Sequence, residues 1–290
     1  MASLLKRRTK GDVIFDTING IFMILLCFST LYPFLFLLFQ SFGNSATISL
    51  LPTTFKITAY ISVIKNSYVW SGFVNTIMRT VVGTVLSVIV TMCAAYALSK
   101  RTFPNRGFWT GLIVFTMFFS GGLIPSYLLM RSLGLYNSFW SMILPSLCSA
   151  YNLTIMRNFF MGIPGELEES AKIDGANDIK IMFQIIVPVS LPIIATIGLW
   201  NAVGHWNAWF DCMIYITEAR KQVLQLILRR IVIEGTSQYM SFTGNLDDGT
   251  YTTEAVKAAT TMVATLPILA VYPFVQKYFV KGVMIGSLKG

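Results

Sequence analysis

The sequence predicts an all-α polytopic membrane protein with six transmembrane helices. Hydrophobic residues make up 54% of the chain and charged residues only 12%, and the mean hydropathy is +0.65. A soluble domain carries about 25% charged residues. Six apolar segments are each long enough for the roughly 20 residues that a helix needs to cross a bilayer. Composition and segment length therefore agree on a membrane protein built from helices.

The predicted spans are joined by short polar connections and one long one. Several spans contain proline, which membrane helices tolerate because neighbouring groups satisfy the freed carbonyls. The first span is longer than the core of a signal peptide, and no clear cleavage site follows it. The spans are placed at 16–41, 71–99, 108–130, 139–160, 185–216 and 257–279. They form one membrane domain, 16–279, between an N-terminal segment 1–15 and a tail 280–290, with a loop at 161–184 and a long loop at 217–256.

Lys and Arg are distributed unevenly between the two sides of this arrangement. Short cytoplasmic loops are enriched in these residues, whereas long loops count less. One side holds more than half of the 22 basic residues: Lys6, Arg7, Arg8, Lys10, Lys100, Arg101, Arg106, Arg157, Lys172, Lys180, Lys277, Lys281 and Lys289. We therefore expect the N-terminus, the C-terminus and the 161–184 loop in the cytoplasm, and the 217–256 loop outside the cell.

Motifs of soluble enzymes and of nucleotide-binding proteins are missing from the sequence. It has no phosphate-binding loop, no metalloprotease or serine-hydrolase motif, and a single histidine. The four cysteines fall in predicted spans and lack metal-ligand spacing. The basic residues behind the net charge of +9 are scattered among apolar spans, which does not suit nucleic acid. We expect no catalytic residue, no metal and no cofactor on this chain, and a source of energy on another protein.

A polar segment at 163–176 interrupts the apolar sequence and predicts a docking element. Pro164 suits the first turn of a helix, where its missing N–H is no loss. Three glutamates follow in that turn, where negative charge complements the helix dipole, and Gly175 suits a left-handed helix end. Asn177 or Asp178 then caps a second helix. Two short helices around a glycine turn offer a surface to a cytosolic partner, although helix-start chemistry on a solvated loop would give the same pattern.

The same segment resembles the EAA loop of ABC importer permeases. Glu169-Ser170-Ala171 is followed by three residues, Gly175, nine residues, Ile185, one residue and Val187-Pro188. The family pattern has alanine in place of Ser170 and leucine in place of Val187, and both changes are mild. The whole chain is similar to the maltose-permease-like carbohydrate class, especially its branch for larger or acidic oligosaccharides. That similarity rests on Asn75-Thr76, Ala95 to Ser99, Phe119 to Pro125, His205-Trp206-Asn207 and Gln276 to Gly286.

The resemblance implies a type I ABC importer permease fold with cytoplasmic EAA coupling helices. It implies a complex in the bacterial inner membrane, with a second homologous permease, two ATP-binding subunits that hold ATP and Mg²⁺, and a solute-binding protein that delivers an oligosaccharide. The chain would contact lipid and no nucleic acid. The residues expected to couple it to an ATPase are Glu166, Glu169, Ala171, Asp174, Gly175 and Ala176. Two alternatives stay open: an ABC permease for a non-sugar solute, and a carrier without an ATPase, for which Asp211 is the main intramembrane carboxylate.

Polar and aromatic residues in the fourth and fifth spans are candidates for the substrate path. Asn201, His205 and Trp209 recur every four residues, so a continuous helix would place them on one face. Buried polar groups in a membrane need partners, so this face should point into the protein or toward a water-filled path. The candidates are Asn152, Asn201, His205, Trp206 and Trp209. The alternative for the fifth-span residues is helix packing together with interfacial tryptophan anchoring.

The 217–256 segment is the longest polar loop in the chain. Its apolar patch at 223–228 predicts partial order, because long loops are usually either functional or disordered. The resemblance implies that this loop reaches the solute-binding protein. The residues expected at that contact are Arg229, Arg230, Asp247 and Asp248. The alternative is a loop that merely covers the outer face of the permease.

Overall fold

The computed structural model describes residues 9–43, 55–234 and 252–287, and side chains only as far as residue 270. The described residues contain helices and no strands. The chain divides into two compact units. The first comprises Met1–Lys65 and Ser241–Thr265, and the second comprises Asn66–Met240 and Leu266–Gly290.

The first unit contains the long helix α1, Lys10–Phe42, and the short helix α2, Thr58–Lys65. Helix α1 begins with a capping box, in which Thr9 and Asp12 exchange hydrogen bonds between side chain and backbone. It matches the first predicted span and extends it at the N-terminal end. The hydroxyls of Ser41 and Tyr60 lie 2.7 Å apart and link the end of α1 to α2.

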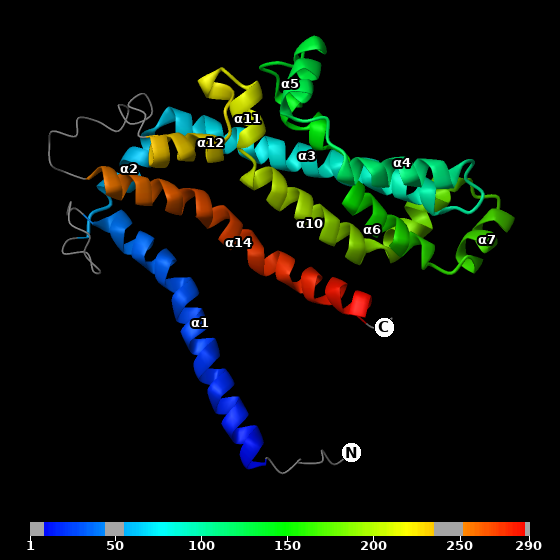
Figure 1. Ribbon diagram of the computed structural model, residues 1–290, viewed down its shortest axis with the longest axis horizontal. Helices are drawn as coiled ribbons and strands as arrows, with labels where there is room; N and C mark the ends of the chain where they lie inside the picture. The colour runs from blue at the N-terminus through cyan, green and yellow to red at the C-terminus, as the bar shows by residue number, and fades with distance from the viewer. Residues whose placement is uncertain (1–8, 44–54, 235–251, 288–290) are drawn as a thin grey trace. The chain divides into compact units, whose positions relative to one another are not determined.

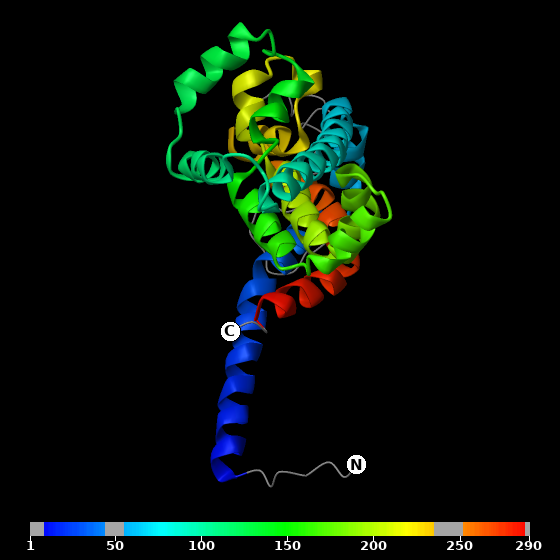
Figure 2. The ribbon, with the colours of Figure 1, turned by 90° about the vertical axis from the view of Figure 1, so that its right-hand side faces the viewer.

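The second unit is built around helix α3, Ser67–Ser99, which packs against α10, Leu191–Asn207, and α6, Ala150–Met161. The three helices run alongside one another in Figures 1 and 2. Close approach of α10 depends on Gly83 of α3, because a Cβ there would lie 2.5 Å from Nε2 of His205. Small residues let helix backbones approach closely within membranes.

Within the described residues, two helices have the length and hydropathy to cross a membrane, α1 and α3. The number rises to four if each of two sharply bent helix pairs is one span. The first pair is α4, Arg106–Phe118, with α5, Leu123–Ser132, bent by 116°; the second joins Asp178–Val189 to α10 with a bend of 85°. The count of six spans therefore stays a prediction.

Both bends interrupt spans that the sequence analysis treats as continuous. The 108–130 span breaks before α5 at Gly122, whose φ of +87° is open mainly to glycine. The 185–216 span breaks at Ser190, between two prolines that cannot donate to the helix ladder. Before the break lie α8, Asp178–Ile181, the π-helix η3, Met182–Ile186, and α9, Val187–Val189.

The 139–160 span is an α-helix only in its second half. Its first half consists of two 3-10 turns, η1 at Phe139–Met142 and η2 at Leu144–Ser146. Helix α6 follows once the Ser149 side chain accepts a hydrogen bond from the Asn152 N–H. The N-terminus of α6 therefore lies inside the predicted span.

The long loop begins with ordered turns. After α11, Phe210–Tyr215, come η4, Ala219–Lys221, α12, Leu224–Arg229, and η5, Arg230–Glu234. The predicted partial order is confirmed, because Val223, Leu224, Leu226 and Ile227 are buried. The last helix, α14, covers Thr253–Ser287 and so continues past the predicted boundary at residue 279.

Candidate functional site

The polar segment forms a short helix, a glycine turn and a second helix start. Helix α7 covers Glu166–Ile173, and Gly175 follows with φ of +76°. The N–H of Ala176 donates to the Ala171 carbonyl at 2.9 Å, which closes the turn. Asn177 caps α8 by accepting from the Lys180 N–H at 2.8 Å. The local structure agrees with the helix, left-handed glycine and cap that the sequence predicts.

Helix α7 has one buried residue, Ala171, and one half-buried residue, Glu168, and its other residues are exposed. Ala171 joins a hydrophobic cluster with residues of α3, α6, α8, η3 and α10, among them Met92, Met156 and Ile197. The remaining predicted coupling residues differ in exposure: Glu166, Glu169, Asp174 and Gly175 are exposed, and Ala176 is half-buried. Ile173, at the end of the helix, is 88% exposed. Helix α7 is therefore anchored to the helix bundle by Ala171 and exposes acidic and apolar side chains to solvent.

An ion pair ties α7 to the end of α3. The ammonium group of Lys100 pairs with the Glu168 carboxylate, and it also lies 4.0 Å from the centre of the Tyr96 ring. Both charged side chains are largely shielded from solvent, at 24% and 18% exposure. Attraction of a cation by an aromatic face adds to the ion pair. No local sequence pattern points to Lys100 and Tyr96 in this role, because Glu168 lies 68 residues beyond Lys100 in the chain.

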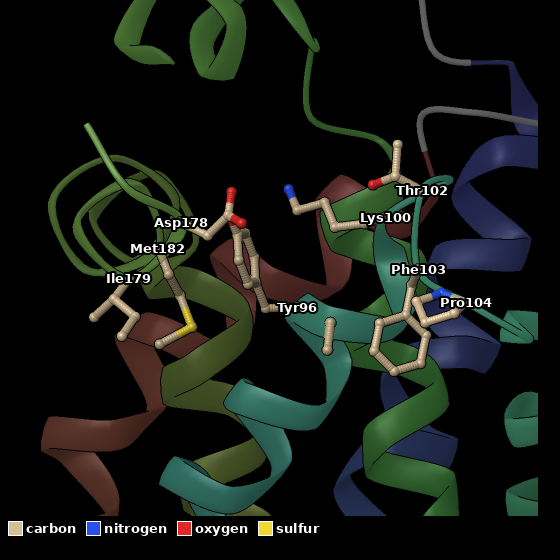
Figure 3. Close-up of a pocket in the computed structure, with 9 residues that line it drawn as sticks. Tyr96, Lys100, Thr102, Phe103, Pro104, Asp178, Ile179 and Met182 are labelled. Atoms are coloured by element: carbon tan, nitrogen blue, oxygen red, sulfur yellow. The ribbon is translucent and has the colours of Figure 1, made fainter. Parts of the chain in front are cut away.

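A pocket of about 340 Å³ opens beside this ion pair (Figure 3). Its walls come from the end of α3, the following turn, α8 and the start of η3. Figure 3 shows Lys100 and Asp178 at its rim, with the Tyr96 ring between the two elements. The pocket marks a gap between the base of α3 and the second helix of the polar segment.

Asn152 of α6 and Asn201 of α10 come together as a pair. The Asn152 Nδ2 donates to Oδ1 of Asn201 at 3.3 Å. The residues just before them also meet, because the Tyr151 and Trp200 rings lie 6.1 Å apart between their centres. Two of the predicted path residues are thus neighbours, and the structure adds an aromatic pair beside them.

His205 and Trp206 lie in the contact between α10 and α3. His205 is 6% exposed and packs against Gly83. Trp206 is buried and meets the Phe73 ring edge-on at 6.1 Å. This arrangement agrees with the helix-packing alternative for these two residues.

The placement of Trp209 on the Asn201–His205 face is wrong. Helix α10 ends at Asn207, and Ala208 has an extended backbone with φ of −74° and ψ of 129°. The Ala208 carbonyl then turns away from the helix ladder and accepts a hydrogen bond from the Arg79 guanidinium at 3.3 Å. Trp209 instead lies under the Arg229 guanidinium, 4.1 Å from the ring centre.

Arg79 of α3 stabilises the break between α10 and α11, a role that no local sequence pattern predicts. Its side chain is almost fully buried and forms a two-pronged ion pair with Asp211. It also donates to the Met142 carbonyl at 3.1 Å, so that one guanidinium joins α3, η1 and the start of α11. Its partners lie 63 to 132 residues away, beyond the reach of any local pattern.

Asn75 and Thr76 anchor the start of the long loop. The Asn75 Nδ2 donates to the carbonyls of Arg220 and Gln222, at 2.8 and 3.0 Å. The Thr76 hydroxyl accepts from the Leu224 N–H at 2.9 Å, at the first turn of α12. Arg229 and Arg230 follow at the end of that helix, whereas Asp247 and Asp248 lie outside the described residues.

Known proteins resemble this chain over nearly its full length. It is 39% identical over 282 residues to the polygalacturonan/rhamnogalacturonan transport system permease protein YtcP of Bacillus subtilis, which covers 96% of this chain and 99% of YtcP. It is 40% identical over 288 residues to Protein LplC of the same organism, with 97% of each chain covered. No protein-family model matches the chain.

A solved structure agrees with these relatives. It is a crystal structure of a bacterial ABC transporter involved in the import of the acidic polysaccharide alginate, with a TM-score of 0.89 and 34% identity. The match covers 94% of this chain and 99% of the other. Likeness in sequence and in fold over almost all residues leads to one conclusion: the chain belongs to the permease family of ABC transporters.

Proposed function

We propose that this chain is one of two permease subunits in an ATP-driven, binding-protein-dependent importer of acidic oligosaccharides. The observation that carries this proposal is full-length similarity to a polygalacturonan/rhamnogalacturonan permease and to an alginate transporter. Both names refer to polysaccharides that contain acidic sugars. The chain would cross the bacterial inner membrane six times, with both termini in the cytoplasm.

The α7–α8 element is proposed as the coupling helices that dock on an ATP-binding subunit. Its support is the combination of a buried base at Ala171 with exposed Glu166, Glu169 and Ile173. Leu167 and Ile179 of the same element are exposed as well, and apolar surface gathered on one element commonly marks a protein contact. Movement of the ATP-binding subunit against α7 would be transmitted to α3 through the Lys100–Glu168 ion pair. Rigid-body movement of the permease would then open its two sides in turn. ATP and Mg²⁺ would stay on the partner.

We assign the remaining predicted residues to two regions of the permease. Asn152 and Asn201 are proposed for the substrate path, while His205 and Trp206 hold α10 against α3. The contact with the solute-binding protein is proposed for Arg229, Arg230, Asp247 and Asp248. Trp209 is assigned to the same region, because its ring lies against the Arg229 guanidinium. Anchoring of the same loop by Asn75 supports a fixed external surface.

Purification of the complex from its native membrane tests the proposal. We expect a second permease, an ATPase and a solute-binding protein to be recovered with the tagged chain. The complex is then placed in liposomes and supplied with labelled trigalacturonate, mannuronate trimer or maltotriose. ATP-dependent uptake of an acidic trimer supports the proposal. Uptake of maltotriose alone would contradict the acidic substrate, and recovery of the chain alone would contradict the importer.

A further inference from the structure

Tyr151 of α6 and Trp200 of α10 form an exposed aromatic pair between two helices. The ring centres are 6.1 Å apart and the planes are inclined by 30°. The two residues are 55% and 36% exposed, so the pair forms part of the surface of this chain. Other exposed aromatic pairs, such as Phe28 and Tyr32 of α1, lie within a single helix. The Tyr151–Trp200 pair depends instead on how α6 and α10 are held together.

The amide pair of Asn152 and Asn201 holds the two helices at this level. Each asparagine directly follows one of the aromatic residues, and their side chains are joined by the 3.3 Å hydrogen bond. Both asparagines are more enclosed than the rings beside them. The ring spacing is therefore set before any ligand arrives, which lowers the entropic cost of binding.

In the proposed topology, α6 ends at the cytoplasmic surface of the membrane, and this places the pair at a depth that is unusual for tyrosine and tryptophan. Tyr151 lies ten residues before the end of α6 at Met161, or about 15 Å along the helix axis. That is about half of a hydrocarbon core of roughly 30 Å. Tyrosine and tryptophan are enriched at the membrane surfaces, where their polar ends meet water. A lipid-facing role would not explain this depth.

The polar ends of both rings lack partners. Among the described residues, neither the Tyr151 hydroxyl nor the Trp200 indole N–H takes part in a hydrogen bond, and neither residue has a further interaction beyond the aromatic one. Lipid tails have no groups to satisfy them, and an unsatisfied polar group in hydrocarbon is costly. The Tyr151 hydroxyl and the Trp200 indole N–H therefore need a hydrogen-bond partner from a polar ligand or from water.

We infer that Tyr151 and Trp200 form a platform on which a sugar ring of the substrate lies as it crosses the membrane. This inference rests on the proposed function. The ring faces would cover the apolar C–H face of a pyranose, while the hydroxyl and the indole N–H bond to its oxygen atoms. No charged group belongs to the platform, so it binds acidic and neutral sugar rings alike, and selection for acid lies elsewhere.

Uptake by variants of the reconstituted complex provides one test. Trp200→Leu and Tyr151→Leu remove a ring and keep an apolar side chain, and we expect each to lower oligosaccharide uptake roughly tenfold at equal amounts of assembled complex. Trp200→Phe keeps a ring and should retain most of the uptake. Tyr32→Leu removes an exposed ring of α1 and should leave uptake normal. Normal uptake by Trp200→Leu would overturn the platform alone, whereas uptake of no oligosaccharide by the unaltered importer would overturn the proposed function.

Photo-cross-linking provides a second test that does not depend on transport rates. Trp200 is replaced by p-benzoylphenylalanine, which inserts into C–H bonds under ultraviolet light, and the complex is supplied with labelled trigalacturonate during ATP turnover. We expect label on this chain from position 200 and none from the same replacement of Tyr32. Cross-linking of position 200 to the partner permease, with no label from the sugar, would overturn the platform.

Discussion

At the scale of single residues, Arg79 forms a buried ion pair that joins three elements of the second unit. Its guanidinium is buried and meets the Asp211 carboxylate and the carbonyls of Met142 and Ala208. A buried charge is tolerated only when it is paired and hydrogen-bonded. The ion pair therefore locks the end of α10 and the start of α11 against α3.

Loss of Arg79 should destabilise the protein. Removal of one member of a buried ion pair costs about 3–5 kcal/mol because it leaves the other charge uncompensated. We expect Arg79→Met to lower the melting temperature of the detergent-solubilised complex, and the double variant Arg79→Met with Asp211→Leu to recover part of the loss. Arg131→Met, at an exposed arginine of α5, is the control and should have little effect. Equal melting temperatures for Arg79→Met and Arg131→Met would refute the role.

At the scale of elements, two glycines of α3 and α10 differ in what surrounds them. A Cβ at Gly83 would meet the His205 ring at 2.5 Å, whereas a Cβ at Gly204 would meet nothing within 4 Å. Gly83→Ala should lower stability by about 1–3 kcal/mol through overpacking. Gly204→Ala should be neutral or slightly stabilising, since alanine favours a helix by about 0.5–1 kcal/mol over glycine. Thermal unfolding of the two variants compares them, and a stable Gly83→Ala would show that α3 and α10 are not closely packed there.

The two glycines that flank α7 provide a test of the coupling element. Gly175 has φ of +76°, which a β-branched residue rarely adopts, whereas Gly165 has φ of −63° and no neighbour within 4 Å of its Cβ position. We expect Gly175→Val to lower the sugar transported per ATP hydrolysed several-fold, because the turn after α7 changes shape. Gly165→Val is the matched control and should transport normally. If both variants couple equally well, the shape of the turn has no part in coupling.

At the scale of the whole molecule, the Lys100–Glu168 ion pair connects α7, the proposed docking helix, to α3. Lys100→Glu places two negative charges side by side and should reduce uptake per ATP. The exchange Lys100→Glu with Glu168→Lys restores opposite charges and should recover part of it, although the contact with Tyr96 is lost. Arg101→Glu changes charge at the next, exposed position and is the control. No recovery in the exchange variant would show that the ion pair does not transmit movement.

Several local features of this protein could be predicted, although the cap of the second helix was left open between Asn177 and Asp178. The cap at Asn177, the left-handed Gly175 and the buried patch at 223–228 follow from backbone geometry and apolar composition, which depend on neighbours in the sequence. The unbroken spans at α1 and α3 were predicted for the same reason. The bends at Gly122 and Ser190 were not, because membrane helices often continue through glycine and proline when other helices satisfy the freed groups.

The sequence by itself determined that this is a helical membrane protein, where its apolar segments lie, and which short loop carries the helix–turn–helix pattern. These properties depend on composition and on residues a few positions apart. Only the tertiary structure decided that Arg79 pairs with Asp211, that Lys100 pairs with Glu168, and that Tyr151 meets Trp200. The partners in these pairs are 49 to 132 residues apart, and such contacts arise from the way helices pack rather than from any periodic pattern.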